Sequence, residues 1–299
     1  MRVFWRMAFC LLILSGSAGK AFADGAPFSL PDTKVLDFTT KDGARSFRLL
    51  IGLPRDYEKR TNERFQTIYL LDADYAFPLG QEMLRHATDR GQLKEAIIVG
   101  IGYPAGDRDL DRYVQNRTRD YTPSYDPQEQ KDSGGADAFL KVLRTELVPY
   151  IDADFRTDPH DRMIVGHSFG GLFATYAMLS APGLFQHFLV VSPSLWYGDR
   201  MIFALAAGYA KQHTSLTADV FYGIGSFENH PDLAMVDDMK AFDAELTAAH
   251  LAGYHSTSMV FDGDIHNSVF PAALERGLRV LDNFAGEAAG NKLEKNLPK

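Results

Sequence analysis

One short stretch of the chain carries the residue types that acyl-transfer chemistry requires. An apolar run over 163–165 leads into Gly-His-Ser-Phe-Gly at 166–170, and a small-residue helical pattern follows. In a strand–turn–helix of this kind the central residue has a strained backbone, so the residues two positions before and after it must be very small, as Gly166 and Gly170 are. Such a turn lifts the Ser168 hydroxyl above the strand ends. We therefore predict Ser168 as a nucleophile that attacks an acyl carbon.

A serine hydroxyl is a poor nucleophile at neutral pH and needs a base within hydrogen-bond reach. His266 follows one predicted strand, precedes a helix and comes last in the chain order nucleophile, acid, histidine. We predict His266 as this base, whereas His167, which lies inside the turn, is predicted to be structural.

The acid that orients the histidine should follow the strand before that of His266. Glu228 lies at that position and is the first candidate, with Asp232 just beyond it. Asp262 and Asp264 are the other candidates, and a Ser–His dyad without an acid stays open.

An acyl-transfer site also needs two amide donors for the oxyanion. The Phe169 amide directly follows the predicted nucleophile, and the second donor should come from the loop after the apolar strand 67–71. We predict the Asp74 amide as this second donor.

These residues fall at the ends of strands that alternate with helices. A hairpin is expected over 35–54, and the strands and helices that follow are expected at 67–71, 78–90, 96–101, 137–155, 160–167, 188–192, 201–213, 218–225, 233–251, 256–262 and 267–284. The turn-rich stretch 105–135 shows no clear period and is expected to be a long loop. The pattern predicts an α/β fold with a mostly parallel sheet and helices on both faces, whose chemistry collects at the carboxyl ends of the strands.

The first 23 residues have the pattern of a secretory leader. Arg2 and Arg6 precede a short apolar core, and Ala-Phe-Ala at 21–23 is a typical cleavage site. Cleavage there would remove three basic residues (Arg2, Arg6, Lys20) and no acidic one, so the net charge would change from −8 to −11. We predict a periplasmic or secreted protein with a leader over 1–23, a single domain over 24–285 and a polar tail over 286–299.

Composition excludes several classes of function. The single cysteine, Cys10, lies in the leader, so the mature chain has neither a cysteine nucleophile nor a cysteine metal ligand. No basic stripe suggests nucleic acid as a partner, and we expect neither a metal site nor a membrane-bound mature chain. The expected partner is a small-molecule ester, and the oligomeric state stays open.

Five motifs together resemble the putative-esterase family of α/β-hydrolases (esterase D-like), and within it the periplasmic siderophore esterases of the salmochelin/enterobactin type. The motifs are Tyr-Leu-Leu-Asp-Ala-Asp at 69–74, Arg-Thr-Arg-Asp-Tyr-Thr-Pro at 117–123, Gly-His-Ser-Phe-Gly-Gly at 166–171, Ser-Pro-Ser-Leu-Trp at 192–196 and Gly-Asp-Ile-His at 263–266. The resemblance implies the α/β-hydrolase fold and hydrolysis through an acyl-serine intermediate without a cofactor. It departs from the family pattern at Ala73, where glycine is usual.

In the siderophore branch, the resemblance also associates an arginine before Thr-Pro with substrate or oxyanion contact. Arg117 and Arg119 are the matching residues, and Tyr121, Trp196 and Tyr197 are predicted to supply stacking for an anionic, aromatic tricatecholate. A general acyl or feruloyl carboxylesterase, an S-formylglutathione-type thioesterase and a non-catalytic binding module remain alternatives.

Overall fold

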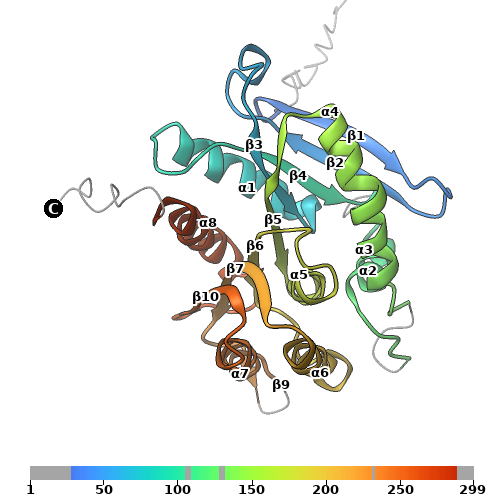
Figure 1. Ribbon diagram of the computed structural model, residues 1–299. Coiled ribbons are helices and arrows are strands. Elements are labelled where there is room, and N and C mark those ends of the chain that lie inside the picture. The colour runs from blue at the N-terminus through green and yellow to red at the C-terminus, as the bar shows by residue number, and fades with distance from the viewer. Residues whose placement is uncertain (1–27, 105–108, 128–131, 231–232, 288–299) are drawn as a thin grey trace, which may run out of the picture.

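A single eight-stranded sheet organises the computed structural model, which describes residues 28–104, 109–127, 132–230 and 233–287. Its strands are, in chain order, β1 (Thr33–Thr39), β2 (Ser46–Gly52), β3 (Phe65–Leu70), β4 (Ala96–Gly102), β5 (Thr157–His167), β6 (His187–Val191), β7 (Ser215–Gly225) and β10 (Ala252–Phe261). They lie in the order β1-β2-β4-β3-β5-β6-β7-β10 (Figure 1). Two short strands, β8 (Asn229–His230) and β9 (Leu233–Ala234), form a separate antiparallel pair that the sequence did not predict.

The strand directions confirm the predicted hairpin followed by a parallel sheet. β1 pairs antiparallel with β2, with Thr39 opposite Ser46 next to the connecting turn, and β2 pairs antiparallel with β4. All the remaining pairs of the large sheet are parallel. Every residue of β3, β4 and β6 is buried, because these continuous apolar strands are covered on both faces.

Helices supply that cover from both sides (Figure 1). They are α1 (Ala73–Thr88), α2 (Leu110–Tyr121), α3 (Ala136–Val142), α4 (Val148–Asp154), α5 (Phe169–Ser180), α6 (Tyr197–Gln212), α7 (Met235–Ala248) and α8 (Val269–Glu287). Buried side chains of α1 and α8 form one apolar cluster with the sheet, and those of α3 to α7 belong to a second, larger cluster. The core therefore consists of two layers separated by the sheet.

The structure corrects several predicted element boundaries. α1 begins at Ala73, five residues before the predicted start, and contains Pro78. The helix predicted over 137–155 is divided into α3, a π-helical turn at Leu143–Leu147 and α4, which has Pro149 in its first turn.

The largest correction concerns the stretch expected to be a loop. Residues 110–121 form the helix α2, whose buried residues are Thr118, Asp120 and Tyr121. The buried face of α2 is polar, so the apolar period by which a helix is usually detected is absent.

The parallel strands direct their carboxyl ends to one edge of the sheet. Ser168 follows β5, Ser192 follows β6, Glu228 lies three residues after β7, and His266 lies five residues after β10. Because these four strands are neighbours in the sheet, the residues at their ends are brought together.

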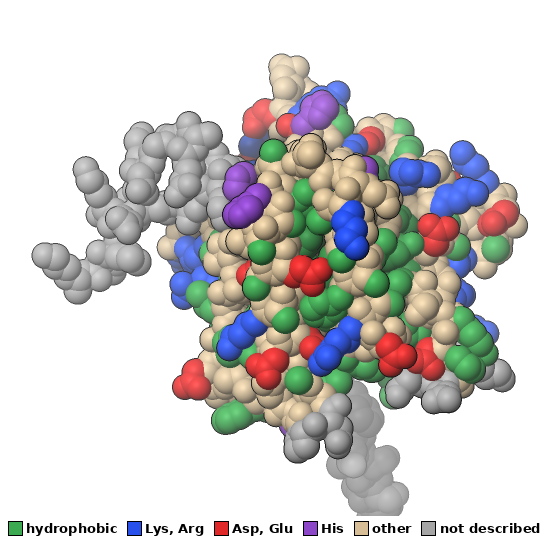
Figure 2. Space-filling view, turned by 60° about the horizontal axis from the view of Figure 1, so that its bottom comes forward, with side chains coloured by type: hydrophobic (Ala, Val, Ile, Leu, Met, Phe, Trp, Pro, Cys, Tyr) green, Lys and Arg blue, Asp and Glu red, His purple; other side chains and the backbone are tan. Residues whose placement is uncertain are grey.

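The surface carries both signs of charge. On the face shown in Figure 2, acidic and basic side chains are interspersed, and hydrophobic side chains are exposed between them. This distribution agrees with the modest formal charge of −8.

Candidate active site

Ser168 occupies the sharp turn between β5 and α5. Its backbone has φ 60° and ψ −120°, an unfavourable conformation for a residue with a side chain. A Cβ atom on Gly166 would lie 2.1 Å from the carbonyl oxygen of Gly170, so the chain can close this turn only with glycine at position 166. The predicted strand–turn–helix is confirmed, and the turn presents the Ser168 side chain to the surface hollows described below.

The His266 imidazole is paired with Glu228. Its Nδ1 lies 2.6 Å from Glu228 Oε2. The other carboxylate oxygen, Oε1, accepts hydrogen bonds from Ser192 Oγ at 2.7 Å and from the Gly225 amide at 2.8 Å. Glu228 is 2% exposed, so protein groups hold both of its oxygens in a fixed orientation.

Asp264 and Asp262, the other described candidate acids, form no hydrogen bond with the His266 ring. Asp264 accepts a hydrogen bond from Ser268 Oγ at 2.6 Å, which is a local turn contact, and the Asp262 side chain is exposed. Asp232 lies outside the described residues. Of the described candidates, Glu228 is therefore the acid that contacts His266.

Ser168 and His266 open onto the same cleft. The Ser168 hydroxyl lies 3.5 Å from Ser194 Oγ, and within the described residues no hydrogen bond joins it to His266. Catalytic hydrogen bonds are often long in ligand-free sites and shorten when substrate binds. The arrangement thus contains a serine, a histidine and a carboxylate in the order that nucleophilic catalysis needs.

His167 contributes a second support for His266. Its Nε2 lies 2.8 Å from the His266 carbonyl oxygen, and its Nδ1 lies 3.1 Å from the Tyr75 hydroxyl. Burial, together with the charges of His266 and Arg117, lowers the pKa of His167 to about 3, so the ring is neutral at physiological pH. A neutral ring that donates through Nε2 accepts at Nδ1, so Tyr75 is the donor in the second contact.

The region of the predicted oxyanion donors lies where two helices begin. Phe169 is the first residue of α5, and Asp74 lies in the first turn of α1. The two helix starts are close together, because the Asp72 carboxylate is 3.2 Å from where a Cβ atom on Gly170 would be. Amides in the first turn of a helix lack intrahelical acceptors, and the roles of the Phe169 and Asp74 amides stay predictions.

Arg117 lines the cleft and is paired with protein groups. Its Nε and Nη2 donate to the two oxygens of Asp72 at 2.8 and 3.1 Å, and Nη2 also donates to the His167 carbonyl oxygen at 2.9 Å. Tyr113 donates a further hydrogen bond to Asp72 at 2.9 Å. Arg117 therefore connects α2 to the end of β3 and to the serine turn, and Asp72 balances its charge.

Of the other predicted substrate contacts, Arg119, Tyr121 and Tyr197 do not line the cleft, whereas Trp196 does. Arg119 is bound to Asp120 through two hydrogen bonds of 2.8 Å. Tyr121 and Tyr197 are fully buried, and the Tyr197 hydroxyl donates to the Ser124 carbonyl oxygen at 2.8 Å. In this structure neither tyrosine presents a surface to the cleft, whereas Trp196 does.

The cleft has two lobes that meet at Ser168, His266 and Asn267. The first, here called the α2 lobe, has a volume of about 460 Å³. Its lining includes Tyr75, Leu79, Tyr113, Val114, Arg117, Phe169 and Phe270. The second, here called the α7 lobe, has a volume of about 510 Å³. Its lining includes Ser194, Trp196, Phe227, His230, Leu233, Met235 and Ile265.

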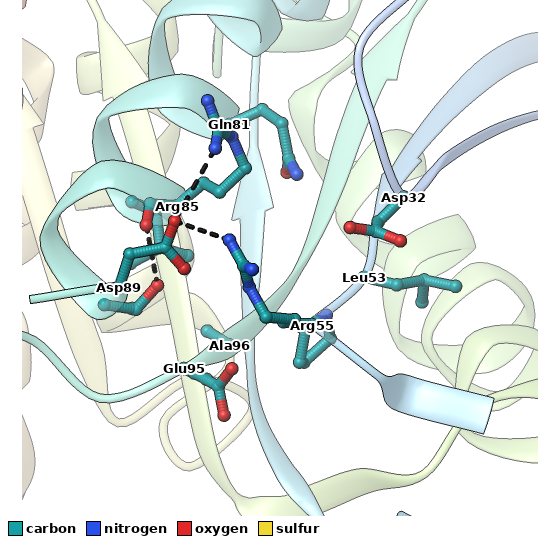
Figure 3. A pocket seen from close by; sticks show the side chains of 11 residues that line it. Asp32, Leu53, Arg55, Gln81, Arg85, Asp89, Glu95 and Ala96 are labelled. Atoms are coloured by element: carbon teal, nitrogen blue, oxygen red, sulfur yellow. Dashed lines mark hydrogen bonds and ion pairs between the residues drawn. The ribbon is translucent and has the colours of Figure 1, made fainter. Parts of the chain in front are cut away.

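A separate hollow beside α1 is unsuitable as a binding site. It holds only about 20 Å³, roughly the space of one water molecule. Figure 3 shows Arg55 and Arg85 directed toward Asp89 at this hollow, and Arg55 Nη2 lies 2.7 Å from Asp89 Oδ2. None of the predicted site residues lines it.

The described part of the chain shows neither a metal-binding cluster nor a membrane-spanning helix. It contains no group of three or more His, Cys, Asp or Glu side chains arranged to hold a metal ion. None of its helices is both long and apolar enough to cross a membrane. The predicted leader over 1–23 lies outside the described residues.

The most informative contacts that the sequence analysis missed are those of Asp72, Tyr75 and Ser192. Asp72 lies two residues after β3 and Ser192 directly follows β6, and both have positive φ angles, 53° and 43°. Their position at strand ends was a signal that could have identified them, but their partners lie 45 and 36 residues away in the chain. Sequence spacing alone does not reveal such pairs.

The family and two of the relatives that this chain matches are described as esterases. The family described as "Putative esterase" matches residues 43–279. The ferri-bacillibactin esterase BesA of Bacillus subtilis is 27% identical over 266 residues, which are 84% of this chain and 90% of that protein. The siderophore triacetylfusarinine C esterase of Aspergillus fumigatus is 26% identical over 277 residues, which are 84% of this chain and 94% of that protein.

A solved structure is similar over most of the chain. It is an IroE-like serine hydrolase from Shewanella oneidensis, with a TM-score of 0.74 and 26% identity, and the match covers 84% of this chain and 80% of that one. Together with the sheet topology, this likeness confirms the predicted α/β-hydrolase fold.

Proposed function

The chain belongs to the putative esterase family and is an ester hydrolase, and we propose that it cleaves the esters of a catecholate siderophore through an acyl intermediate on Ser168. The observation that carries the catalytic assignment is the 2.6 Å contact between His266 Nδ1 and Glu228 Oε2, in a cleft that Ser168 shares. The siderophore assignment is supported by the names of two relatives, both siderophore esterases.

In the proposed first step, His266 Nε2 takes the proton of Ser168 Oγ as this oxygen attacks the ester carbonyl carbon. The Glu228 carboxylate holds Nδ1–H, which keeps Nε2 free to accept the proton and stabilises the imidazolium that forms. The Phe169 and Asp74 amides are the proposed donors to the oxyanion.

Collapse of the tetrahedral intermediate expels the alcohol, which receives its proton from His266 Nε2–H. Water then attacks the acyl-serine, again losing its proton to His266, and the free acid leaves with Ser168 restored. In this scheme Tyr75 and His167 hold the backbone of His266, and Arg117 holds the serine turn through its hydrogen bond to the His167 carbonyl oxygen.

The nucleophile can be tested with a fluorophosphonate probe and with p-nitrophenyl butyrate turnover. Ser168→Ala should abolish labelling and turnover. Ser194→Ala is the matched control, because its hydroxyl lies 3.5 Å from that of Ser168, and it should still be labelled. Labelling that persists in Ser168→Ala would refute the nucleophile assignment.

The substrate requires a panel of esters. Iron-free and ferric tricatecholate esters should be cleaved faster than short acyl esters, feruloyl esters and S-formylglutathione. A clear preference for feruloyl esters or the thioester would replace the siderophore assignment by one of those activities. Tight binding of a tricatecholate without any release of product would indicate a binding module.

We also propose that the protein is exported as a single domain over 24–285 after loss of residues 1–23. The basis is the leader pattern in the sequence. N-terminal sequencing of the protein from the culture medium or periplasm should begin at Asp24. A chain that retains Met1 in the cytoplasm would contradict this proposal.

A further inference from the structure

The α7 lobe is a largely apolar hollow beside Ser168 and His266. Phe227 and Ile265 are 59% and 53% exposed at its edge, and Leu233 and Met235 line it together with Trp196. Glu228, the one carboxylate in the described lining, is held by hydrogen bonds with Ser192, Gly225 and His266. Apart from Glu228, Ser168, Ser194, Asn267 and the imidazoles of His230 and His266, the described lining offers apolar contact area.

The α2 lobe has the same character on the other side of the reacting groups. Tyr75, Leu79 and Val114 are 41%, 39% and 43% exposed there. The one arginine in its described lining, Arg117, is held by both oxygens of Asp72. This lobe likewise offers mainly apolar contact area.

Exposed apolar residues are concentrated at these two lobes. Nine large apolar side chains are exposed in the described part of the chain, and five of them line one lobe or the other. Single exposed apolar residues need no explanation, but a cluster rimmed by polar groups is typical of a binding surface. Ser168 and His266 lie at the junction of the two hollows.

From this geometry we infer that the enzyme selects esters carrying an aromatic or similarly bulky apolar group on each side of the scissile bond, one group for each lobe. The inference rests on the proposed hydrolysis at Ser168, because that residue places the ester at the junction. It adds that the acyl and the alcohol parts are recognised separately, each by its own lobe.

Four esters of matched reactivity test this inference. They are ethyl propionate, ethyl 3-phenylpropionate, 2-phenylethyl propionate and 2-phenylethyl 3-phenylpropionate, in which two carbons separate each ring from the reacting group. Each ring should raise kcat/KM by roughly tenfold, the least that a well-filled apolar pocket gives, and the two effects should multiply.

One variant in each lobe identifies where the rings bind. Phe227→Ser in the α7 lobe should remove the effect of one ring, and Val114→Ser in the α2 lobe should remove the effect of the other. Tyr125→Ser and Val35→Ser are matched controls, because these exposed side chains line neither lobe, and both should leave all four rates unchanged.

The inference fails if the two-ring ester is no better than the one-ring esters, or if both variants weaken the same ring. The four corresponding amides, which resist cleavage, repeat the comparison as dissociation constants, so the test does not depend on turnover. If two-ring esters are preferred but tricatecholate esters are not cleaved, the siderophore assignment fails and the two-lobe inference stands.

Discussion

Replacing Glu228 by glutamine should disable the site through the tautomer of His266. Two donors, Ser192 Oγ–H and the Gly225 amide, point at the position of Oε1, so the carbonyl oxygen of a glutamine must occupy that position. Its NH₂ group then faces His266 Nδ1 in place of the carboxylate oxygen now 2.6 Å away. A donor at this position makes Nδ1 an acceptor and puts the ring proton on Nε2.

A histidine protonated on Nε2 cannot accept the proton of Ser168. We therefore expect kcat to fall by about 10³- to 10⁴-fold, as the equivalent change does in serine proteases. KM should change little, because Glu228 is 2% exposed and its oxygens face protein groups. The measurements are steady-state kinetics on p-nitrophenyl butyrate and ¹⁵N NMR of the His266 ring, which reports the tautomer directly.

Glu275→Gln is the matched control, since that carboxylate forms a surface ion pair with Arg279 on α8 and should tolerate the change. Thermal melting should show that both variants are folded. A loss of kcat smaller than about tenfold in a folded Glu228→Gln protein would mean that Ser168 and His266 act as a dyad, and would refute the reasoning above.

Three other perturbations have definite expected outcomes. Gly166→Ala should lower stability by about 3 kcal/mol or more, because its Cβ atom would meet the Gly170 carbonyl oxygen at 2.1 Å; an unchanged melting temperature would contradict this. Tyr75→Phe removes the donor to His167 Nδ1 and should lower kcat about fivefold with KM nearly constant, as expected for one hydrogen bond; a change confined to KM would show that Tyr75 only contacts substrate. Because the pKa of His167 is lowered to about 3, its neutral form stabilises the fold fully above about pH 6.5, and this contribution is lost as the pH falls toward 3. The melting temperature should therefore fall less on acidification in His167→Gln than in the wild type. In His187→Gln it should fall more than in the wild type, because Asp161 and Asp219 overcome burial and raise the pKa of His187. If the melting temperature depends on pH equally in all three proteins, these assignments are refuted.

Much of the candidate site could be predicted from the sequence because its residues lie next to strand ends. Ser168, Glu228 and His266 follow three strands that the structure confirms, and parallel strands bring such residues to one edge. The side-chain contact between Glu228 and His266 then follows from the adjacency of β7 and β10. Local sequence and one topological rule were sufficient for this part.

The remainder depended on contacts that local sequence does not encode. α2 was missed because its buried Asp120 and Tyr121 are polar, and a charge pair with Arg119 and a hydrogen bond from Tyr103 stabilise the Asp120 carboxylate in the interior. The pairing of Arg117 with Asp72 joins residues that are 45 positions apart. The substrate contacts predicted at 117–121 assume a loop, whereas these residues belong to a helix, which places residues three and four positions apart on the same face.

The link between Arg117, Asp72 and the serine turn has a consequence for how selectivity can change. α2 lines one lobe and also holds the turn that carries Ser168. Mutations that alter this helix should therefore also impair catalysis. Phe227, Leu233 and Ile265 line the opposite lobe through side chains that have no polar atoms to share with Glu228 or His266. Natural divergence and laboratory evolution toward new esters should therefore accumulate at the α7 lobe, while α2 changes slowly.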